Sequence, residues 1–154
     1  GFRSLGIGSL LGLGDWRAEA VALAIHAQQL TRRHWRSRVA VSFPRLVSSQ
    51  RGFEPAAPVT DAALVQMMVV LRLFLPDAEL VVSTREPPDL RDRLVGCGVT
   101  RMSAGSRTSP GGYVDGAAGE QFCVEDRRSP AEVSAMLERR GYEPVWKDFD
   151  RALR

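Results

Sequence analysis

Residues suited to binding a small charged ligand follow each of four β-like runs in this sequence. They are glycines, arginines and small hydroxyl residues, and they occupy the segments 6–12, 42–45, 83–86 and 103–107. In parallel α/β folds the carboxyl ends of the strands meet at one rim, and ligands bind there. Each segment alone is a weak signal, but their succession at four strand ends predicts a binding site.

Two arginines are the strongest ligand candidates. Arg45 follows a strand and the φ-fixing Pro44, so we expect its guanidinium to project over the rim and bind a carboxylate through two hydrogen bonds. The alternative is a surface arginine that pairs with a neighbouring residue. Arg85 is the second candidate. The side chain of Glu86 points to the opposite face of the same strand, and we expect it to bind either Arg85 or the amino group of a substrate.

The glycine and serine segments predict room for a ligand. Gly6 and Gly8 belong to a run that resembles a phosphate-binding loop but lacks the G-x-G-x-x-G spacing. These glycines serve either the close approach of a ligand or a tight turn, and the sequence leaves both interpretations open. Ser103 and Ser106 bring small hydroxyls and backbone donors to the fourth strand end.

The sequence contains no recognisable catalytic or metal-binding motif. His26 and His34 fall within or at the end of the first predicted helix, far from any strand end. Cys97 and Cys123 lie 26 residues apart without C-x-x-C pairing, which fits reduced thiols better than a disulfide or a metal site. We therefore predict ligand-binding residues without a catalytic residue or a metal ligand in this chain.

Composition places the chain among globular proteins. Its 154 residues suggest one domain, and 44% hydrophobic and 25% charged residues are ordinary values for that class. The net charge is +3, but the arginines are spread along the chain, and the one dense cluster, 32–38, is typical of a helix end rather than a nucleic-acid surface. No secretory signal or membrane-spanning run is present, so we expect a cytoplasmic protein.

Apolar periodicity predicts alternating strands and helices. The expected strands are 4–9, 38–43, 79–84 and 99–103. Helices are expected after Asp15, after Thr60, around 90–95, and after Ser129, whose capping box includes Glu132. Turn-rich segments cover 47–59 and 104–125, and a short strand-like run follows at 144–146.

Four strands joined by helical crossovers predict a parallel sheet. The strands begin about 35, 40 and 20 residues apart, which is ordinary for a (β/α)₈ barrel, although four units make only half of one. A small open doubly wound sheet is the alternative, and the pattern alone does not separate the two. The second and third strands are apolar runs, as expected when both faces of the sheet are covered.

The strand-end motifs resemble those of the 2-iminoacetate synthase family, the tyrosine lyases of thiamine thiazole synthesis. This family consists of radical S-adenosylmethionine enzymes built on a (β/α)₈ barrel, and it is similar to biotin synthase and to the tyrosine lyase of hydrogenase maturation. The resemblance runs from end to end of the chain. It is carried by segments 6–13, 15–17, 34–38, 42–46, 83–86, 110–113, 121–122, 126–128 and 144–148.

The resemblance implies that the chain matches strands five to eight of the barrel plus a C-terminal extension, with the division between 1–108 and 109–154. In the family, a 4Fe–4S cluster on a C-x₃-C-x₂-C motif cleaves S-adenosylmethionine, and the resulting radical breaks tyrosine into 2-iminoacetate and p-cresol. That cysteine motif is absent here, and Cys97 and Cys123 cannot replace it.

The resemblance also assigns roles to individual residues. Gly6 and Gly8 would line the S-adenosylmethionine side of the pocket. Arg45, with Ser42 near it, would bind the carboxylate of the amino acid, whereas Arg85, Ser103 and Ser106 would complete the pocket.

We expect this chain to be a truncated piece of a longer lyase, inactive without its N-terminal half; the alternatives are a missing half in another chain, or two such halves that pair. The expected partners are tyrosine, that missing half and, in the family, thiazole synthase; neither nucleic acid nor a membrane is expected. One alternative is a non-catalytic half-barrel that binds an amino acid or S-adenosylmethionine. Another is the hydrogenase-maturation lyase, but that relative carries extra cysteines near its C-terminal end, and none follows Cys123 here.

Overall fold

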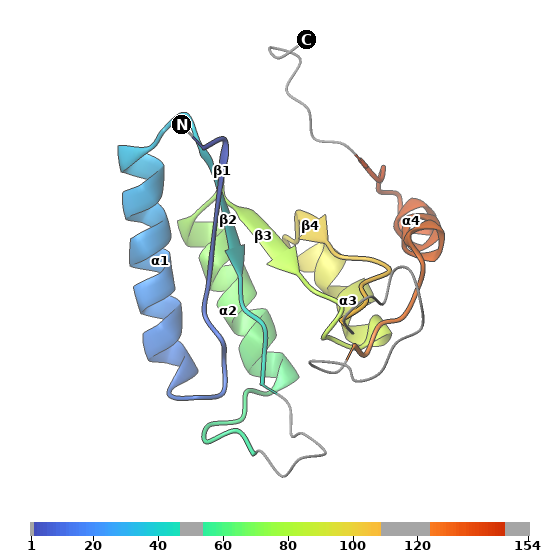
Figure 1. Cartoon of the computed structure of the whole chain (residues 1–154), viewed down its shortest axis with the longest axis horizontal. Coiled ribbons are helices and arrows are strands. Elements are labelled where there is room, and N and C mark those ends of the chain that lie inside the picture. The colour runs from blue at the N-terminus through green and yellow to red at the C-terminus, as the bar shows by residue number, and fades with distance from the viewer. Residues whose placement is uncertain (1, 47–53, 109–123, 147–154) are drawn as a thin grey trace.

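A computed structural model describes residues 2–46, 54–108 and 124–146. Four strands alternate with helices along the chain (Figure 1). In order, the elements are β1 (Ser4–Gly8), α1 (Trp16–Arg33), β2 (Arg38–Ser42), α2 (Asp61–Phe74), β3 (Glu79–Val82), α3 (Pro88–Leu94), the 3₁₀ helix η1 (Val95–Cys97), β4 (Arg101–Met102) and α4 (Pro130–Arg139).

The four strands form one parallel sheet in the order β1-β2-β3-β4. Ser42 of β2 lies opposite Gly8 of β1 and opposite Val81 of β3, and Val82 lies opposite Met102 of β4. Each neighbouring pair of strands is joined by a helical crossover. The predicted α/β class is therefore confirmed, and the arrangement is that of half of a (β/α)₈ barrel.

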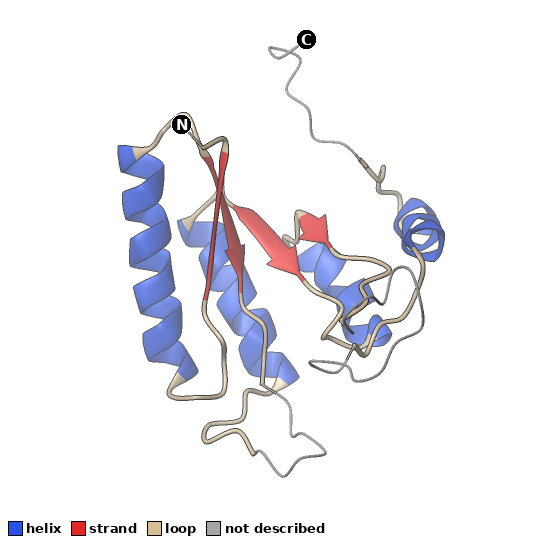
Figure 2. Cartoon of the chain, in the orientation of Figure 1, coloured by secondary structure: helices blue, strands red, loops and turns tan. Residues whose placement is uncertain are grey.

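The three crossover helices cover one face of the sheet (Figure 2). Their buried side chains form a single core with alternate residues of β2 and β3, because successive strand residues point to opposite faces. Val41 and Leu80, which lie opposite each other, are completely buried in this core. Helix α4 packs separately, beside η1 and β4, through Val133 and Met136.

The opposite face of the sheet carries small and polar residues. Gly6 and Gly8 are exposed, Ser42 and Val81 are half-buried, and no helix in the described part of the chain packs on this face. The expected burial on both faces therefore holds for the middle of β2, where Val39, Ala40 and Val41 are all buried, but is wrong for β3. Burial alternates along β3, because only every second side chain of this strand enters the helical core.

The predicted helix starts are confirmed. Asp15 and Thr60 accept hydrogen bonds from Arg17 N (3.0 Å) and Ala63 N (3.2 Å). At α4 the Ser129 hydroxyl accepts from Glu132 N (3.3 Å) while Glu132 accepts from Ser129 N (2.7 Å), so both halves of the capping box form. None of the described helices is long and apolar enough to cross a membrane.

Two strand predictions differ from the structure. Segment 144–146 contains no strand, so that expectation is wrong. Strand β4 has two residues rather than five. The Thr100 hydroxyl accepts a hydrogen bond from Leu80 N (2.8 Å), so a side chain takes the place of a backbone partner just before β4 begins. Most of the turn-rich segments, 47–53 and 109–123, lies outside the described residues.

Candidate functional site

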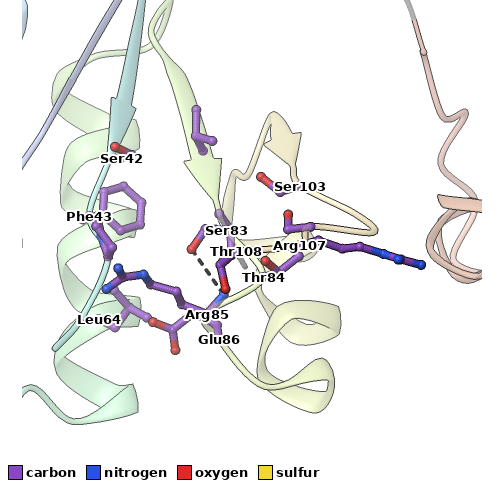
Figure 3. A pocket seen from close by; sticks show the side chains of 14 residues that line it. Ser42, Phe43, Leu64, Ser83, Thr84, Arg85, Glu86, Ser103, Arg107 and Thr108 are labelled. Carbon is purple, nitrogen blue, oxygen red and sulfur yellow. Dashed lines mark hydrogen bonds between the residues drawn. The ribbon is translucent and has the colours of Figure 1, made fainter. Parts of the chain in front are cut away.

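A cavity of about 400 Å³ lies at the carboxyl ends of β2, β3 and β4. Strand-end residues line it, as the sequence predicted for this rim, and Figure 3 draws the lining residues as sticks. Four predicted site residues are among the lining residues, together with Glu86: Ser42, Arg85, Ser103 and Ser106. The structure thus brings most of the predicted substrate-binding residues to one site.

The cavity combines hydroxyl groups with side chains of both charges. Ser83 and Thr84 line it beside Arg85 and Glu86, and the Ser83 hydroxyl accepts a hydrogen bond from Arg85 N (3.4 Å) (Figure 3). Arg107 also belongs to the lining, and in Figure 3 its side chain points away from the other labelled side chains. Such a set of groups suits a ligand that carries both a cation and an anion.

Arg45 does not line the cavity, although the sequence predicted it as the principal carboxylate ligand. Its Nε donates to Glu86 Oε1 (3.0 Å), and its Nη2 donates to Glu86 Oε2. Its Nη1 contacts the Val59 carbonyl (2.8 Å) and Asp61 Oδ1 (2.9 Å). The guanidinium of Arg45, which we expected to bind a substrate carboxylate, is thus bound to Glu86 of the same chain.

These contacts keep Arg45 charged although its side chain is only 12% exposed. Burial lowers the pKa of Arg45, but the hydrogen bonds and charges of Glu86 and Asp61 outweigh burial and raise that pKa above the usual arginine value. The guanidinium therefore acts as a permanent cation that joins the ends of β2 and β3 to the start of α2.

Gly6 and Gly8 lie outside the cavity lining. A Cβ on Gly8 would lie 2.5 Å from Ser42 Oγ and 2.6 Å from the Ser42 carbonyl oxygen, so the close packing of β1 against β2 requires glycine there. A Cβ on Gly6 would meet no atom within 4 Å. Gly8 thus has a packing explanation, whereas Gly6 leaves open space on the uncovered face of the sheet.

Sequence reasoning missed a buried ionic network beneath the cavity rim. Arg91 on α3 donates to the Asp126 carboxylate and to the carbonyl of Ser103. Arg128 donates to the same carboxylate through Nε (3.0 Å) and Nη2 (2.7 Å), and Nη2 also contacts Asp92 Oδ1 (2.8 Å). One carboxylate is thereby shared by two guanidinium groups.

The network fastens the segment 124–128 to the ends of two strands. The amides of Glu125 and Asp126 both donate to the Thr84 carbonyl (3.0 Å each), and Gly105 N donates to the Arg128 carbonyl (3.1 Å). Thr84 follows β3 and Gly105 follows β4. The segment therefore fixes the spacing of two strand ends that line the cavity.

The position of Arg91 gave a usable sequence signal. It lies between the apolar Leu90 and Leu94 on the buried face of a short helix, and a buried arginine requires an anionic partner. Nothing local in the sequence identified that partner as Asp126, which is 35 residues away.

The pKa shifts in the network follow its geometry. Burial lowers the pKa of Arg91, partly opposed by Asp126. Burial raises the pKa of the Asp126 carboxyl, but the hydrogen bonds from Arg128 and the charge of Arg91 outweigh it and hold that pKa below the usual range. The hydrogen bonds to Asp126 and Asp92 raise the pKa of Arg128. The shifts of Asp126 and Arg128 both favour the charged form of the group.

Comparison with protein families decides the family of this chain. The family model of the Biotin and Thiamin Synthesis associated domain matches residues 42–143, which include all the residues that line the cavity. The chain belongs to the Biotin and Thiamin Synthesis associated domain family. The family model runs across the predicted division at residue 108, so that division stays a prediction.

Curated relatives of this Biotin and Thiamin Synthesis associated domain chain are 2-iminoacetate synthases, which confirms the predicted resemblance. The chain is 43% identical to the 2-iminoacetate synthase of Escherichia coli (strain K12) over 155 residues, covering 99% of this chain and 41% of that protein. It is 41% identical to the Salmonella typhimurium enzyme, covering 97% and 40%. The chain thus spans about two fifths of the length of these relatives.

Solved structures of the [FeFe]-hydrogenase maturase HydG share the fold. One superposes with a TM-score of 0.83 at 33% identity, covering 95% of this chain and 32% of that one. HydG from Carboxydothermus hydrogenoformans gives a TM-score of 0.78 at 37% identity, covering 92% of this chain and 33% of that one. The four-stranded sheet therefore corresponds to part of a larger chain in each solved structure.

The side chains of this family member do not fit a three-cysteine iron–sulfur cluster. The chain has two cysteines, of which Cys97 lies in η1 and donates from Sγ to the Arg93 carbonyl (3.8 Å), whereas Cys123 lies outside the described residues. Within the described ranges, no group of three or more His, Cys, Asp or Glu residues is placed to hold a metal ion. Ligands for a cluster would have to come from outside this chain.

Proposed function

We propose that this chain provides the tyrosine-binding part of a radical S-adenosylmethionine lyase of the 2-iminoacetate synthase type. The reaction would cleave L-tyrosine into 2-iminoacetate and p-cresol for the thiazole ring of thiamine. The observation that carries the proposal is the cavity at three strand ends, with Arg85, Glu86 and several hydroxyls, in a chain 43% identical to a 2-iminoacetate synthase.

Arg85 takes the carboxylate-binding role in this proposal. It lines the cavity, whereas the guanidinium of Arg45 is bound to Glu86 and Asp61. A guanidinium matches a carboxylate through two parallel hydrogen bonds. Ser103 and Ser106, at the far side of the rim, would complete the polar contacts of the amino acid.

The chain on its own is proposed to bind substrate without turning it over. Its side chains do not supply the cluster that reduces S-adenosylmethionine. We propose that an N-terminal half-barrel carrying the C-x₃-C-x₂-C motif supplies the cluster, and that it completes the sheet beside β1 and β4. Gly6, on the open face, would leave room for S-adenosylmethionine, because a Cβ there would meet no atom within 4 Å.

Calorimetry with L-tyrosine tests the binding part of the proposal. The wild-type chain should bind L-tyrosine, and Arg85→Gln should weaken that binding by roughly tenfold or more, because a charged hydrogen-bond pair is worth roughly 1.5–3 kcal/mol. Arg93→Gln is the matched control, since Arg93 is an exposed arginine on α3 outside the cavity lining. A wild-type chain that does not bind L-tyrosine would contradict the proposal.

Turnover is tested by supplying the missing half. The chain alone should release no p-cresol, and addition of a cluster-bearing N-terminal half of a 2-iminoacetate synthase should restore release. Tyrosine binding without restored turnover would favour the alternative, a non-catalytic binding half-barrel.

The solved HydG structures support a second candidate, the tyrosine lyase of hydrogenase maturation, because the fold matches with a TM-score of 0.83. The two candidates are distinguished in cells. A functional pair of halves should relieve thiamine auxotrophy in a strain that lacks 2-iminoacetate synthase, whereas relief of a hydrogenase-maturation defect alone would establish the second candidate.

A further inference from the structure

Resting on this proposed function, we infer that Glu86 recognises the amino group of the substrate and that Arg45 positions Glu86 for that task. The substrate class would be free α-amino acids, selected over analogues that lack the amino group. Arg45 would then be a positioning residue rather than a direct ligand of the substrate carboxylate.

Glu86 has the placement that this role needs. It is only 6% exposed, and it lines the cavity directly beside Arg85. A buried carboxylate is costly unless it is paired, and Arg45 pairs with both of its oxygens. The pairing fixes the carboxylate plane, since a guanidinium fork and a carboxylate are both planar.

The charges of the group leave an attraction for a cation. Arg45 carries one positive charge and shares it between two carboxylates, those of Glu86 and Asp61. A carboxylate has about four acceptor positions, and the fork of Arg45 takes two of those of Glu86. An ammonium group in the cavity is a suitable donor to the others.

The neighbouring Arg85 supplies the opposite charge. Arg85 and Glu86 are consecutive residues after β3, and both line the same cavity. A cation and an anion presented from one strand end match the ammonium and carboxylate that an α-amino acid carries on a single carbon. A ligand lacking either group would form one charged contact fewer in the site, so it should bind more weakly than an α-amino acid.

Arg45 is held in place by contacts at the start of α2 as well as by Glu86. Its Nη1 contacts the Val59 carbonyl just before α2 and the Asp61 carboxylate in the first turn of α2. The orientation of Glu86 is therefore set by the β2–α2 connection, although Glu86 itself follows β3.

Two ligands separate amine recognition from general damage to the site. L-tyrosine and 3-(4-hydroxyphenyl)propionate differ only by the amino group, and binding of each to the wild-type chain and its variants is measured by calorimetry. Glu86→Gln should weaken L-tyrosine binding by roughly tenfold, because a charged hydrogen bond is lost. Binding of the propionate should change by no more than about twofold, because it has no amine to lose.

A double-mutant cycle tests the positioning role. Arg45→Gln should also weaken the binding of L-tyrosine more than that of the propionate. If Arg45 acts only through Glu86, adding Arg45→Gln to Glu86→Gln should cause no further loss of this selectivity. Arg101→Gln is the matched control, because it removes another arginine–glutamate pair, with Glu79, away from this cavity. It should leave both affinities unchanged.

Folding is checked by circular dichroism and thermal unfolding. If Glu86→Gln does not fold, Arg45→Lys provides the same test, since it keeps the charge but loses the two-pronged contact. If the folded Glu86→Gln variant bound both ligands equally more weakly, or bound L-tyrosine as well as the wild type does, this inference would be overturned while the proposed function would stand. Failure of the wild-type chain to bind L-tyrosine would overturn the proposed function and this inference together.

Discussion

Arg91 and Asp126 form a salt bridge in which both side chains are completely buried, although 35 residues separate them in the sequence. Arg91 also donates to the carbonyl of Ser103, a residue that lines the cavity. The helix α3, the end of β4 and the segment after residue 123 are therefore joined at one point. The cavity rim depends on an ionic contact that is shielded from solvent.

Removal of Asp126 should destabilise the protein strongly. Asp126→Ala leaves Arg91 buried without its anion, and breaking such a pair from one side costs about 3–5 kcal/mol. Asp92→Ala is the matched control, because Asp92 pairs with the partly exposed Arg128, and its loss should cost about 1 kcal/mol or less. Urea unfolding of the three proteins checks this order. Equal costs for the two variants would contradict a special role for the buried pair.

The same carboxylate should make stability depend on pH. The pKa of Asp126 is lower in the folded protein than its ordinary value, so its contribution to the free energy of unfolding is complete above the ordinary aspartate pKa of about 3.9. The contribution is lost as the pH falls from there through the lowered folded pKa.

Asp126→Asn removes this titration. The difference in the free energy of unfolding between wild type and Asp126→Asn should therefore shrink as the pH falls from about 6 to about 3. Urea unfolding at several pH values measures it. A difference that stays constant over this range would show that Asp126 does not titrate with a lowered pKa.

Helix α4 should depend on its capping box. Ser129→Ala removes the hydroxyl that accepts from Glu132 N, and loss of such a cap costs about 1 kcal/mol. Ser134→Ala places the same substitution in the middle of α4 and should cost little, because alanine is the better helix former there. Hydrogen exchange of the α4 amides checks the prediction. Faster exchange in both variants would show that the cap has no special effect.

Local signals made the helices predictable, whereas the site depended on contacts between distant segments. Asp15, Thr60 and Ser129 mark helix starts because a cap involves residues only two or three positions away. The rule that ligands bind at the carboxyl ends of parallel strands likewise predicted the position of the cavity. The rule could not show that Arg45 meets Glu86, 41 residues further on, because a proline fixes the local backbone but not the partner of the next side chain.

The two glycines of β1 offer a matched pair for a final prediction. Gly8→Ala would place a Cβ 2.5 Å from Ser42 Oγ and 2.6 Å from the Ser42 carbonyl oxygen, so β1 and β2 would have to move apart. Overpacking of this kind costs about 1–3 kcal/mol. Gly6→Ala meets no atom within 4 Å and should be neutral or slightly stabilising, because alanine restricts the unfolded chain.

Urea unfolding of both glycine variants tests this difference. Adding Ser42→Ala to Gly8→Ala should recover only part of the loss, because the backbone oxygen of residue 42 still obstructs the new Cβ. Full recovery would assign the whole clash to the hydroxyl. Equal stability of the Gly6 and Gly8 variants would show that β1 and β2 do not approach each other as closely as the structure places them.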